Sequence, residues 1–410
     1  MKKPKQKKKP SKQRSPGKLA RELMHNLSAA APKVAPACRH FGTCGGCELQ
    51  DLAYDEQLKT KRAVFEKMIN VAELREFFAS APLETVPSPQ PFAYRQRMDF
   101  VFAFGEAGLR LRGSYTRVVE LFECHLIAPP AFAAFRRTIE LARALEIPSY
   151  DYLKHEGCLR YVITRYARNG SVLVALVTKS DAPDPRIERI AETLLAENRA
   201  QSVHWLVQPT LADMSFGTPV RFWGREHIEE SLLGLRLLLG PQNFFQANPA
   251  VAERAYALLA EYGRASGLHE ALDLYAGAGA IGYTLARDFR LVTAVESEPA
   301  NLEMAARNAE LNAILNVEFV KSDAAAWLES AVPREVYIAV NPPRLGLGPK
   351  ASAQLARLNA PALGYMSCNP ATLLEDLRTL RHSYRLEAAH LLDMFPQTRH
   401  FETVLLLRRG

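Results

Sequence analysis

Hydrophobic residues repeat with two different periods along the first 240 positions of the chain. In residues 55–69 they recur every three to four positions, which predicts an amphipathic helix. Residues 97–113 and 159–178 instead alternate large apolar and polar side chains around a turn, and the second turn has an Asn-Gly tip. Each of these two stretches predicts a β-hairpin. We therefore expect a β-rich domain over residues 92–240.

From residue 249 onward, helix-like segments alternate with short apolar runs that predict strands. The runs lie at residues 271–275, 291–296, 317–323, 335–343, 361–368, 384–393 and 400–409. This alternation predicts an α/β fold with a doubly wound parallel sheet and helices on both faces. The last two runs are too close for a helix between them, so we expect them to pair as an antiparallel hairpin. A seven-stranded sheet of this kind is typical of the Rossmann-like, class I S-adenosylmethionine methyltransferase fold.

The positive charge of the chain is concentrated at its beginning. Of 410 residues, 52 are Lys or Arg and 44 are Asp or Glu, which gives a net charge of +8. Residues 1–21 hold ten of the bases and no acid, so the rest of the chain has 42 bases against 44 acids, a net charge of −2. We expect residues 1–36 to be a disordered basic tail that holds nucleic-acid phosphates non-specifically, or that only solubilises the protein.

The length exceeds that of one ordinary hydrophobic core, so several domains are expected. After the tail we expect a cysteine loop and helix over residues 37–91, then the β-rich domain, then a catalytic domain over residues 241–410. No apolar run is long enough to cross a bilayer, and the first residues lack a secretory signal. We therefore expect a cytoplasmic protein without membrane association and without an obligate protein partner.

A glycine-rich turn follows the first strand of the predicted sheet. Gly277 and Gly279 lie at the end of the run LDLYAGAG, where a doubly wound sheet binds its ligands. The second strand ends in Glu296, whose carboxylate can accept hydrogen bonds from both hydroxyls of a ribose. A packing turn or another nucleotide site has a similar glycine pattern. The glycines and Glu296 together favour a cofactor site.

Asn341 begins an Asn-Pro-Pro-Arg run after the fourth predicted strand. The two prolines stiffen the backbone where the Asn341 amide must point into the cleft. Amino-group methyltransferases have a similar Asn-Pro-Pro followed by an aromatic residue that stacks on the base, whereas Arg344 follows here. This difference weakens amino-group methylation, which stays open as an alternative function.

One cysteine and one carboxylate are placed for covalent chemistry on a pyrimidine. Carbon 5 of uracil accepts a methyl group only after a thiolate adds to carbon 6, and a base must then remove the proton from carbon 5. Cys368 ends the fifth strand just before a helix that starts with proline, so we expect the helix dipole to stabilise its thiolate. Glu402 starts the last strand and is the expected base. The alternative for Cys368 is a buried structural thiol, and the alternative for Glu402 is an acid on the surface of the hairpin.

Four further cysteines form a candidate metal site. Cys38, Cys44 and Cys47 share the tight loop CRHFGTCGGC. Cys124 is the natural fourth ligand, which leaves Cys158 as an ordinary strand residue. All-sulfur ligation suits either a 4Fe-4S cluster or zinc, and the spacing does not choose between them.

Six motifs occur in the order found in RNA uracil-5 methyltransferases, and over residues 38–410 the chain resembles that family. The motifs are CRHFGTCGGC with Cys124, GPQNFFQANP, DLYAGAG, NPPR, SCNPATL and DMFPQTRHFE. The resemblance implies that the four cysteines bind a 4Fe-4S cluster. The contacts that it implies for S-adenosylmethionine are Gln246, Tyr275, Glu296 and Asn341. It also implies that Cys368 is the nucleophile and Glu402 the base.

The Asn-Pro-Pro-Arg form resembles that of the shorter bacterial 23S rRNA enzymes, which also lack an amino-terminal β-barrel RNA-binding module. The family often has Asp where this chain has Asn341 and Cys where it has Ala276. We expect methylation of carbon 5 of a uridine in 23S rRNA, with tRNA as the alternative substrate.

The base must leave the folded RNA and enter the cleft between the two domains. Candidate RNA contacts are Tyr94, Arg95, Arg97, Arg399 and His400. The alternative from a different functional class is an RNA-binding iron-sulfur sensor that does not transfer a methyl group.

Overall fold

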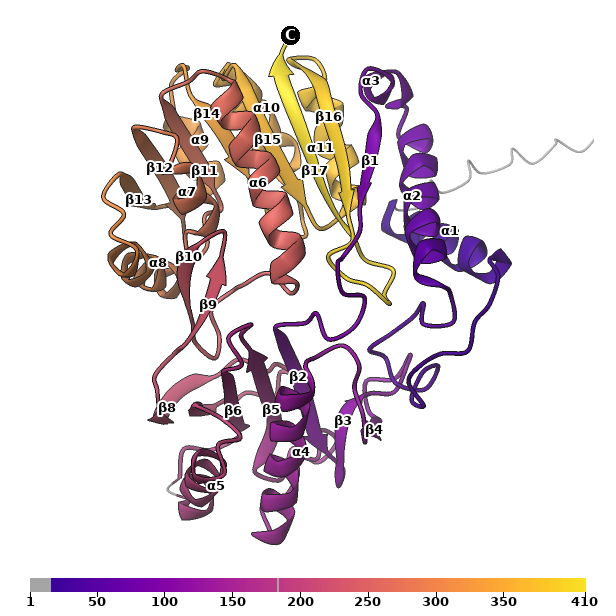
Figure 1. Cartoon of the computed structure of the whole chain (residues 1–410), viewed down its shortest axis with the longest axis vertical. Coiled ribbons are helices and arrows are strands. Elements are labelled where there is room, and N and C mark those ends of the chain that lie inside the picture. Colours follow the sequence, from indigo (N-terminus) through magenta and orange to yellow (C-terminus); the bar gives the residue numbers. More distant parts are fainter. Residues whose placement is uncertain (1–15, 183) are drawn as a thin grey trace, which may run out of the picture.

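The computed structural model describes residues 16–182 and 184–410, which form two stacked bodies (Figure 1). The upper body is a large sheet with helices on both faces, and the lower body is a second sheet with helices packed on it. Helices from the beginning of the chain lie beside the upper sheet. Residues 1–15, the first part of the expected basic tail, lie outside the described residues.

The upper sheet confirms the doubly wound prediction. Its strand order is β1-β16-β17-β15-β14-β11-β12-β13. Only β17 runs antiparallel to its neighbours, and its pairing with β16 is the predicted hairpin. The strands that the sequence predicted are β11 (Glu270–Leu274), β12 (Leu291–Glu296), β13 (Val317–Lys321), β14 (Tyr337–Val340), β15 (Ala362–Ser367), β16 (Tyr384–Leu392) and β17 (Glu402–Arg409).

This sheet has one strand more than the seven that were expected. β1 (Leu83–Val86) pairs in parallel with β16 at the edge of the sheet, with Leu83 opposite Ala389. A run of four residues is too short to show a period in the sequence. The extra strand ties the segment at residues 37–91 to the catalytic sheet.

The strands of the upper sheet place side chains in two separate cores. Leu272 and Leu274 lie in one core and Ala271 in the other. The first core contains residues of α9 (Ala324–Ser330), α10 (Gly348–Arg357) and α11 (Pro370–Leu380). The second contains residues of α6 (Pro249–Ala265) and α7 (Ala280–Leu285), and α8 (Pro299–Leu311) packs against β12 and β13. Both faces are covered, which explains why the central strands β14 and β15 are buried throughout.

The lower body is a mixed sheet of order β4-β3-β2-β5-β6-β7-β8. Its β2–β3 and β5–β6 pairs are the two predicted hairpins. The strands are β2 (Arg97–Ala103), β3 (Glu106–Arg110), β4 (Val118–Glu120), β5 (Leu159–Tyr166), β6 (Val172–Thr178), β7 (Ser202–Val207) and β8 (Thr218–Gly224). α4 (Pro129–Ala144) and α5 (Pro185–Ala196) pack on this sheet.

A separate hairpin connects the two bodies. It consists of β9 (Ile228–Leu232) and β10 (Leu235–Leu239). Leu232 and Leu237 lie in the second core of the upper body, whereas Ile228 lies in a core of the lower body. The hairpin therefore packs against α6, α7 and α8 of the upper body, although it precedes residue 241, where the catalytic domain was expected to begin.

The expectation of disorder over residues 1–36 is wrong for its second half. α1 (Pro16–Ala30) is a helix that packs on α2 (Tyr54–Val71), and α3 (Arg75–Ala79) follows. Met24 is buried, and Leu23 and Leu27 pack against the first core of the upper body. These apolar residues at helical spacing stabilise the segment despite its charge. Among the described residues, no helix combines the length and the apolar character that a membrane span requires.

Candidate active site

The carboxyl ends of β11 and β14 border a small pocket. Tyr275 follows β11, Asn341 follows β14, and Gln246 comes from the segment between β10 and α6. All three line this pocket, and Gln246 is buried. The Asn341 N–H donates to the Leu274 carbonyl at 3.3 Å and holds the end of β14 against β11. Three of the four residues predicted to contact the cofactor therefore share one pocket.

The glycine-rich turn between β11 and α7 contributes another part of the lining. Gly277 and Gly279 have φ angles of 57° and 89°, in the left-handed region that favours glycine. A Cβ atom on Gly279 would lie 2.4 Å from the Tyr283 ring. Beneath the turn, the Asp273 carboxylate accepts the Gly282 N–H at 2.8 Å, and burial raises the pKa of Asp273 to about 7. The turn requires glycine both for its backbone and for space.

Glu296, the fourth predicted cofactor contact, ends β12 and reaches the same turn. Its Oε2 accepts the Gly277 N–H at 2.8 Å. Its Oε1 accepts the N–H groups of Ser297 and Glu298, both at 2.8 Å. A carboxylate has about four acceptor positions, so Glu296 retains capacity for a further donor. Glu296 thus fixes the turn and presents an acid beside the pocket.

Cys368 and Glu402 lie next to each other across two antiparallel strands. Ser367 ends β15 opposite Thr403 of β17, so the next pair outward is Cys368 and Glu402. The Thr403 hydroxyl donates to the Ser367 carbonyl at 3.2 Å and supports this pairing. Glu402 is 3% exposed, and its Oε2 has no hydrogen-bond partner in the part of the chain that the structure describes. The predicted nucleophile and base therefore share one site.

Both groups hold their protons more tightly than usual. Burial raises the pKa of Glu402 to about 8, and the Arg344 guanidinium opposes this shift. Burial and, next, the nearby Glu402 raise the pKa of the Cys368 thiol to about 11, again opposed by Arg344. The effect of the α11 dipole on the thiolate stays a prediction, and in the unliganded protein burial outweighs the favourable charges around Cys368.

The Asn-Pro-Pro-Arg run joins the cofactor pocket to the pocket of Cys368. Asn341 lines the first pocket and Arg344 lines the second. The Arg344 carbonyl accepts the side-chain amide of Asn369 at 2.8 Å. Asn369 also caps α11, because its side-chain oxygen accepts the Ala371 N–H at 3.2 Å. The run places the Arg344 guanidinium beside the predicted nucleophile, Cys368.

The pocket of Cys368 has a volume of about 310 Å³ and a strongly basic lining. Among the described residues, no Asp or Glu lines it, and its four cations are Lys18, Arg21, Arg344 and Arg399. His400 also lines it, and burial lowers the pKa of His400 to about 4, so this ring is uncharged at neutral pH. The sequence had suggested Arg399 and His400 as RNA contacts. Lys18 and Arg21 were missed because they were assigned to a disordered tail.

The four predicted cysteine ligands lie close enough to influence one another. Cys38, Cys44 and Cys47 precede α2, and Cys124 follows β4. Burial and then the three neighbouring thiols raise the pKa of Cys47 to about 12. The side-chain amide of Gln50 donates to the Cys47 sulfur at 3.1 Å. Such buried thiols need a cation to ionise, so this all-sulfur set fits a thiolate-binding metal or cluster. Cys158 lies directly before β5 and is not among them.

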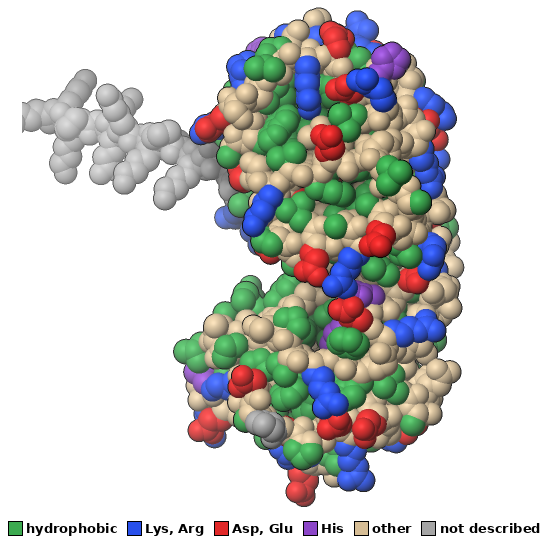
Figure 2. Space-filling model, turned by 90° about the vertical axis from the view of Figure 1, so that its left-hand side faces the viewer, with side chains coloured by type: hydrophobic (Ala, Val, Ile, Leu, Met, Phe, Trp, Pro, Cys, Tyr) green, Lys and Arg blue, Asp and Glu red, His purple; other side chains and the backbone are tan. Residues whose placement is uncertain are grey.

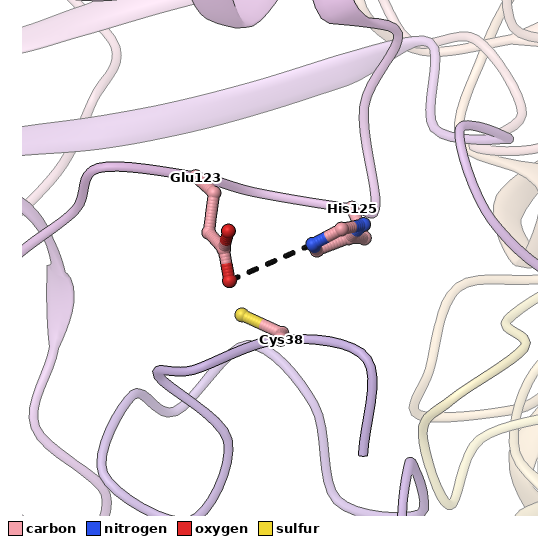
Figure 3. A group of neighbouring side chains, drawn as sticks. All are labelled: Cys38, Glu123 and His125. Atoms are coloured by element: carbon pink, nitrogen blue, oxygen red, sulfur yellow. Dashed lines mark ion pairs between the residues drawn. The ribbon is translucent and has the colours of Figure 1, made fainter.

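A second group of possible ligands shares Cys38. Cys38, Glu123 and His125 each offer an atom within 4.8 Å of the other two, and Figure 3 shows Cys38 approaching the pair from a different segment. His125 Nε2 lies 3.6 Å from Glu123 Oε1. Glu123 also accepts the Arg39 N–H at 2.7 Å and so joins the two segments. The Glu-Cys-His sequence around Cys124 is the signal that points to this group.

A larger cleft of about 1080 Å³ lies between the two bodies, and Figure 2 shows the surface hollowed there. Its lining includes Arg95, Arg97, Phe216 and Phe244. The Arg97 guanidinium lies 5.2 Å from the centre of the Phe216 ring, which is half exposed. Tyr94, in contrast, is buried and donates to the Pro396 carbonyl at 2.9 Å. The prediction that Tyr94 lines the RNA path is wrong, because its hydroxyl supports the loop before β17.

Two buried polar residues that the sequence did not single out hold the surrounding loops. Asp376 of α11 accepts the Leu347 N–H at 2.8 Å and the Tyr365 hydroxyl at 2.6 Å. Asn308 of α8 accepts the Leu238 N–H at 2.8 Å and joins β10 to the cofactor pocket. In the sequence, Asp376 and Asn308 stand out only as polar residues on the apolar face of a helix.

Known RNA methyltransferases are similar to this chain over nearly its whole length. Residues 236–410 match the family model described as tRNA (Uracil-5-)-methyltransferase. An RNA methyltransferase of Clostridium tetani is 33% identical over 389 residues, which cover 92% of this chain and 84% of that protein. The tRNA (uracil(54)-C(5))-methyltransferase of Pyrococcus abyssi is 33% identical over 377 residues, which cover 92% of this chain and 86% of that protein.

The structural similarity extends to both bodies of the molecule. The crystal structure of the Pyrococcus abyssi tRNA (uracil-54, C5)-methyltransferase in complex with S-adenosyl-L-homocysteine has a TM-score of 0.75 and 32% identity. The match covers 89% of this chain and 84% of that one. S-adenosylhomocysteine is what remains of S-adenosylmethionine after it has given up its methyl group. The chain therefore belongs to the tRNA (uracil-5-)-methyltransferase family and is an S-adenosylmethionine-dependent RNA methyltransferase.

Proposed function

We propose that this enzyme methylates carbon 5 of a uridine in RNA through a covalent bond between Cys368 and carbon 6 of the base. The observation that carries the proposal is the pairing of Cys368 with the buried Glu402 at the ends of β15 and β17. An adjacent thiol and carboxyl serve the two separate steps that methylation of a pyrimidine carbon requires. Amino-group methylation requires neither a nucleophilic cysteine nor a base that removes a proton from carbon.

The first step is the addition of the thiol to the base. Cys368 gives its proton to solvent, and its sulfur forms a bond to carbon 6. The electrons of the carbon 5–carbon 6 double bond move toward carbon 5 and the carbonyl oxygen on carbon 4. Arg344 opposes the rise in the pKa of the thiol, so its guanidinium favours the ionised sulfur that must attack.

The cofactor pocket lies on the other side of the Asn-Pro-Pro-Arg run. Its proposed cofactor contacts are Gln246, Tyr275, Glu296 and Asn341. S-adenosylmethionine, when bound there, supplies the methyl group that carbon 5 accepts. Because the run that begins at Asn341 ends at Arg344, the same rigid segment orients both reactants.

Glu402 completes the cycle as the base. Its carboxylate takes the proton from carbon 5, the double bond re-forms, and the bond between sulfur and carbon 6 breaks so that the thiolate leaves. The raised pKa of about 8 makes the ionised carboxylate a stronger base than an exposed glutamate. Oε2 of Glu402 has no partner among the described residues and is the acceptor for this proton.

We propose 23S rRNA as the substrate, with tRNA as the second candidate. The Asn-Pro-Pro-Arg run supports 23S rRNA through its resemblance to the shorter bacterial rRNA enzymes. The Pyrococcus relatives support tRNA, since they are named as enzymes acting on uracil 54 of tRNA. The chemistry at Cys368 and Glu402 is the same for both substrates.

We further propose that Cys38, Cys44, Cys47 and Cys124 hold a 4Fe-4S cluster with a structural role, in a cytoplasmic protein. The reaction requires no electron from such a cluster. Directly after Cys47, Glu48 binds Arg399 at 2.8 Å, and the Leu49 N–H donates to the Gln397 carbonyl at 3.0 Å. A cluster would therefore fix the cysteine loop that supports the segment leading to Glu402.

Transfer of a labelled methyl group tests the proposed reaction. Anaerobically purified protein is incubated with tritium-labelled S-adenosylmethionine and unmodified 23S rRNA or tRNA, and the RNA is digested to nucleosides. We expect 5-methyluridine from the wild type and from the control Cys158→Ala, and none from Cys368→Ala. Activity of Cys368→Ala would support amino-group methylation instead. Product from tRNA alone would overturn the rRNA assignment, and RNA binding by the wild type without methyl transfer would favour the iron-sulfur sensor.

A further inference from the structure

Helix α1 forms one wall of the pocket that contains Cys368. Its residues on this wall are Gly17, Lys18, Ala20, Arg21 and Met24. Their spacing of three and four positions places them on one side of the helix. Met24 is 5% exposed and anchors the helix against the catalytic body. The wall is therefore a fixed part of the pocket.

The basic side chains of α1 add to a charge that the pocket already has. Arg344 and Arg399 contribute two cations from the catalytic domain, and Arg399 is paired with Glu48. Lys18 and Arg21 are exposed, and neither forms an ion pair with any residue of 16–182 or 184–410. Cations that share one pocket without an acid repel one another. Their arrangement is favourable once an anion lies between them.

The space beside α1 is open. A Cβ atom added to Gly17 would meet no heavy atom within 4 Å. The pocket volume of about 310 Å³ is at the lower end of the range of about 300–1,000 Å³ for sites that hold one small molecule. One extruded nucleotide fits such a space, whereas a duplex does not. A helix whose role was only to cover the core would not need to place Lys18 and Arg21, which form no ion pair with another described residue, beside this cavity.

We propose that α1 is part of the RNA site, and that Lys18 and Arg21 bind the phosphates flanking the target nucleotide while its base lies against Cys368. This inference rests on the proposed function and assigns it two positioning residues. An extruded base pulls its own backbone out of the helix, so the phosphates on either side must be held near the pocket entrance. Lysine and arginine are the side chains that hold phosphates.

The salt dependence of RNA binding tests this inference. The variants are Lys18→Ala/Arg21→Ala and Lys18→Glu/Arg21→Glu, and the control is Lys67→Ala/Arg75→Ala, exposed residues of α2 and α3 outside the pocket. We expect the first double variant to bind RNA about 10-fold more weakly, and its slope of log Kd against log salt to fall by about 1.4–1.8, two phosphate contacts. KM for RNA should rise by the same factor while kcat at saturating RNA is unchanged. The control should match the wild type.

Protection of Cys368 from alkylation gives a readout that does not require methyl transfer. N-ethylmaleimide labelling of the Cys368 peptide is followed by mass spectrometry with and without RNA. RNA should protect the wild type, and both α1 variants should need about 10-fold more RNA for equal protection. Since alanine and glutamate favour helices, circular dichroism should show an intact fold.

The two proposals fail in different ways. If the wild type makes 5-methyluridine but the α1 variants keep its salt slope and its protection of Cys368, the role of α1 is overturned and the proposed function stands. If the wild type makes no 5-methyluridine but RNA still protects Cys368 in a manner that depends on Lys18 and Arg21, the proposed function fails and the α1 site stands.

Discussion

Glu402 is a single residue whose chemistry depends on burial. Its pKa of about 8 means that most molecules carry a protonated Glu402 at neutral pH, and only the ionised form accepts the proton from carbon 5. We therefore expect the single-turnover rate at which free 5-methyluridine is released from Cys368 to rise from about pH 6 to about pH 9. Rapid-quench measurement of labelled RNA that is no longer bonded to the protein checks this profile. A rate that is flat across this range would contradict the assignment of Glu402 as the base.

Glu402→Gln should trap the enzyme on its substrate. The amide cannot take the proton from carbon 5, so the methylated base stays bonded to Cys368, and we expect turnover to fall by about 10²–10⁴-fold. The trapped species is a protein–RNA adduct that survives denaturing electrophoresis. The double variant Cys368→Ala/Glu402→Gln serves as the control and should form no adduct. Full turnover by Glu402→Gln would remove Glu402 from the mechanism.

The same carboxyl should make stability depend on pH. The pKa of Glu402 is raised from an ordinary value of 4.5 to about 8 in the folded protein, so folding favours the protonated form. Its stabilising contribution is complete below about pH 4.5 and is lost as the pH rises through about 8. We expect Glu402→Gln and wild type to have equal Tm near pH 4.5, and the variant to have the higher Tm near pH 9. Thermal unfolding followed by circular dichroism measures the difference, and an equal Tm at both pH values would contradict it.

The position of a single residue in the fold was predictable from the sequence where the residue lies at the end of a predicted strand. Cys368 and Glu402 are far apart in the sequence, yet the predicted hairpin and parallel order bring the ends of β15 and β17 together. Supporting residues such as Asp376 were not predictable, because their role depends on which backbone N–H groups approach them in three dimensions. Shifts in pKa have the same limit, because the burial that raises the pKa of the Cys368 thiol depends on the packing around it in three dimensions.

Helix α2 is joined to the loop before β17 by an ion pair that is fully buried. Lys61 Nζ lies 2.5 Å from Asp393 Oδ1, and both side chains are 0% exposed. Lys61 also donates to the Phe395 carbonyl at 3.0 Å. A second connection runs from Gln57 to Gln397 at 2.9 Å. The loop that leads to Glu402 is therefore held by an element from the beginning of the chain.

Removing one partner of this pair should destabilise the protein strongly. Lys61→Met leaves Asp393 buried without a counter-charge, and we expect the free energy of unfolding to fall by about 3–5 kcal/mol. Lys59→Met on the same helix breaks only the exposed pair with Glu56 and should leave the free energy of unfolding close to that of the wild type. Urea denaturation of both variants gives the comparison. If both variants lost the same free energy of unfolding, the buried pair would not be what stabilises the loop before β17.

At the level of elements, the long periodic segments were predictable and the short or highly charged ones were not. The catalytic strands and both hairpins of the lower body follow directly from their hydrophobic pattern. β1 has only four residues, and its pairing with β16 is decided by contacts across the molecule. α1 lies within a basic segment, where its apolar stripe is visible only once α2 is present to cover it.

Over the whole molecule, the cysteine loop contacts both the lower body and the loop before β17, because Gly45 N–H donates to the Arg110 carbonyl of β3 and Glu48 N–H donates to the Gln397 carbonyl. Two ligand sets are available there, the four cysteines and the group of Cys38, Glu123 and His125. We expect Cys124→Ser to lose bound iron and sulfide and His125→Ala to retain them, measured by colorimetric assay and visible absorption of anaerobic protein. Loss of iron from His125→Ala together with its retention in Cys124→Ser would reverse the choice of ligands.

The position of β17 in the sheet has a consequence for synthesis of the protein. β17 is the last strand of the chain, yet it lies between β15 and β16 and carries Glu402 at its start. A ribosome must therefore make two strands whose hydrogen-bonding edges stay unpaired until the final strand emerges between them. During that interval the nascent chain exposes edges that invite aggregation or chaperone binding. β17 brings Glu402, the proposed base, so a chain that lacks this strand could not complete the proposed methylation cycle.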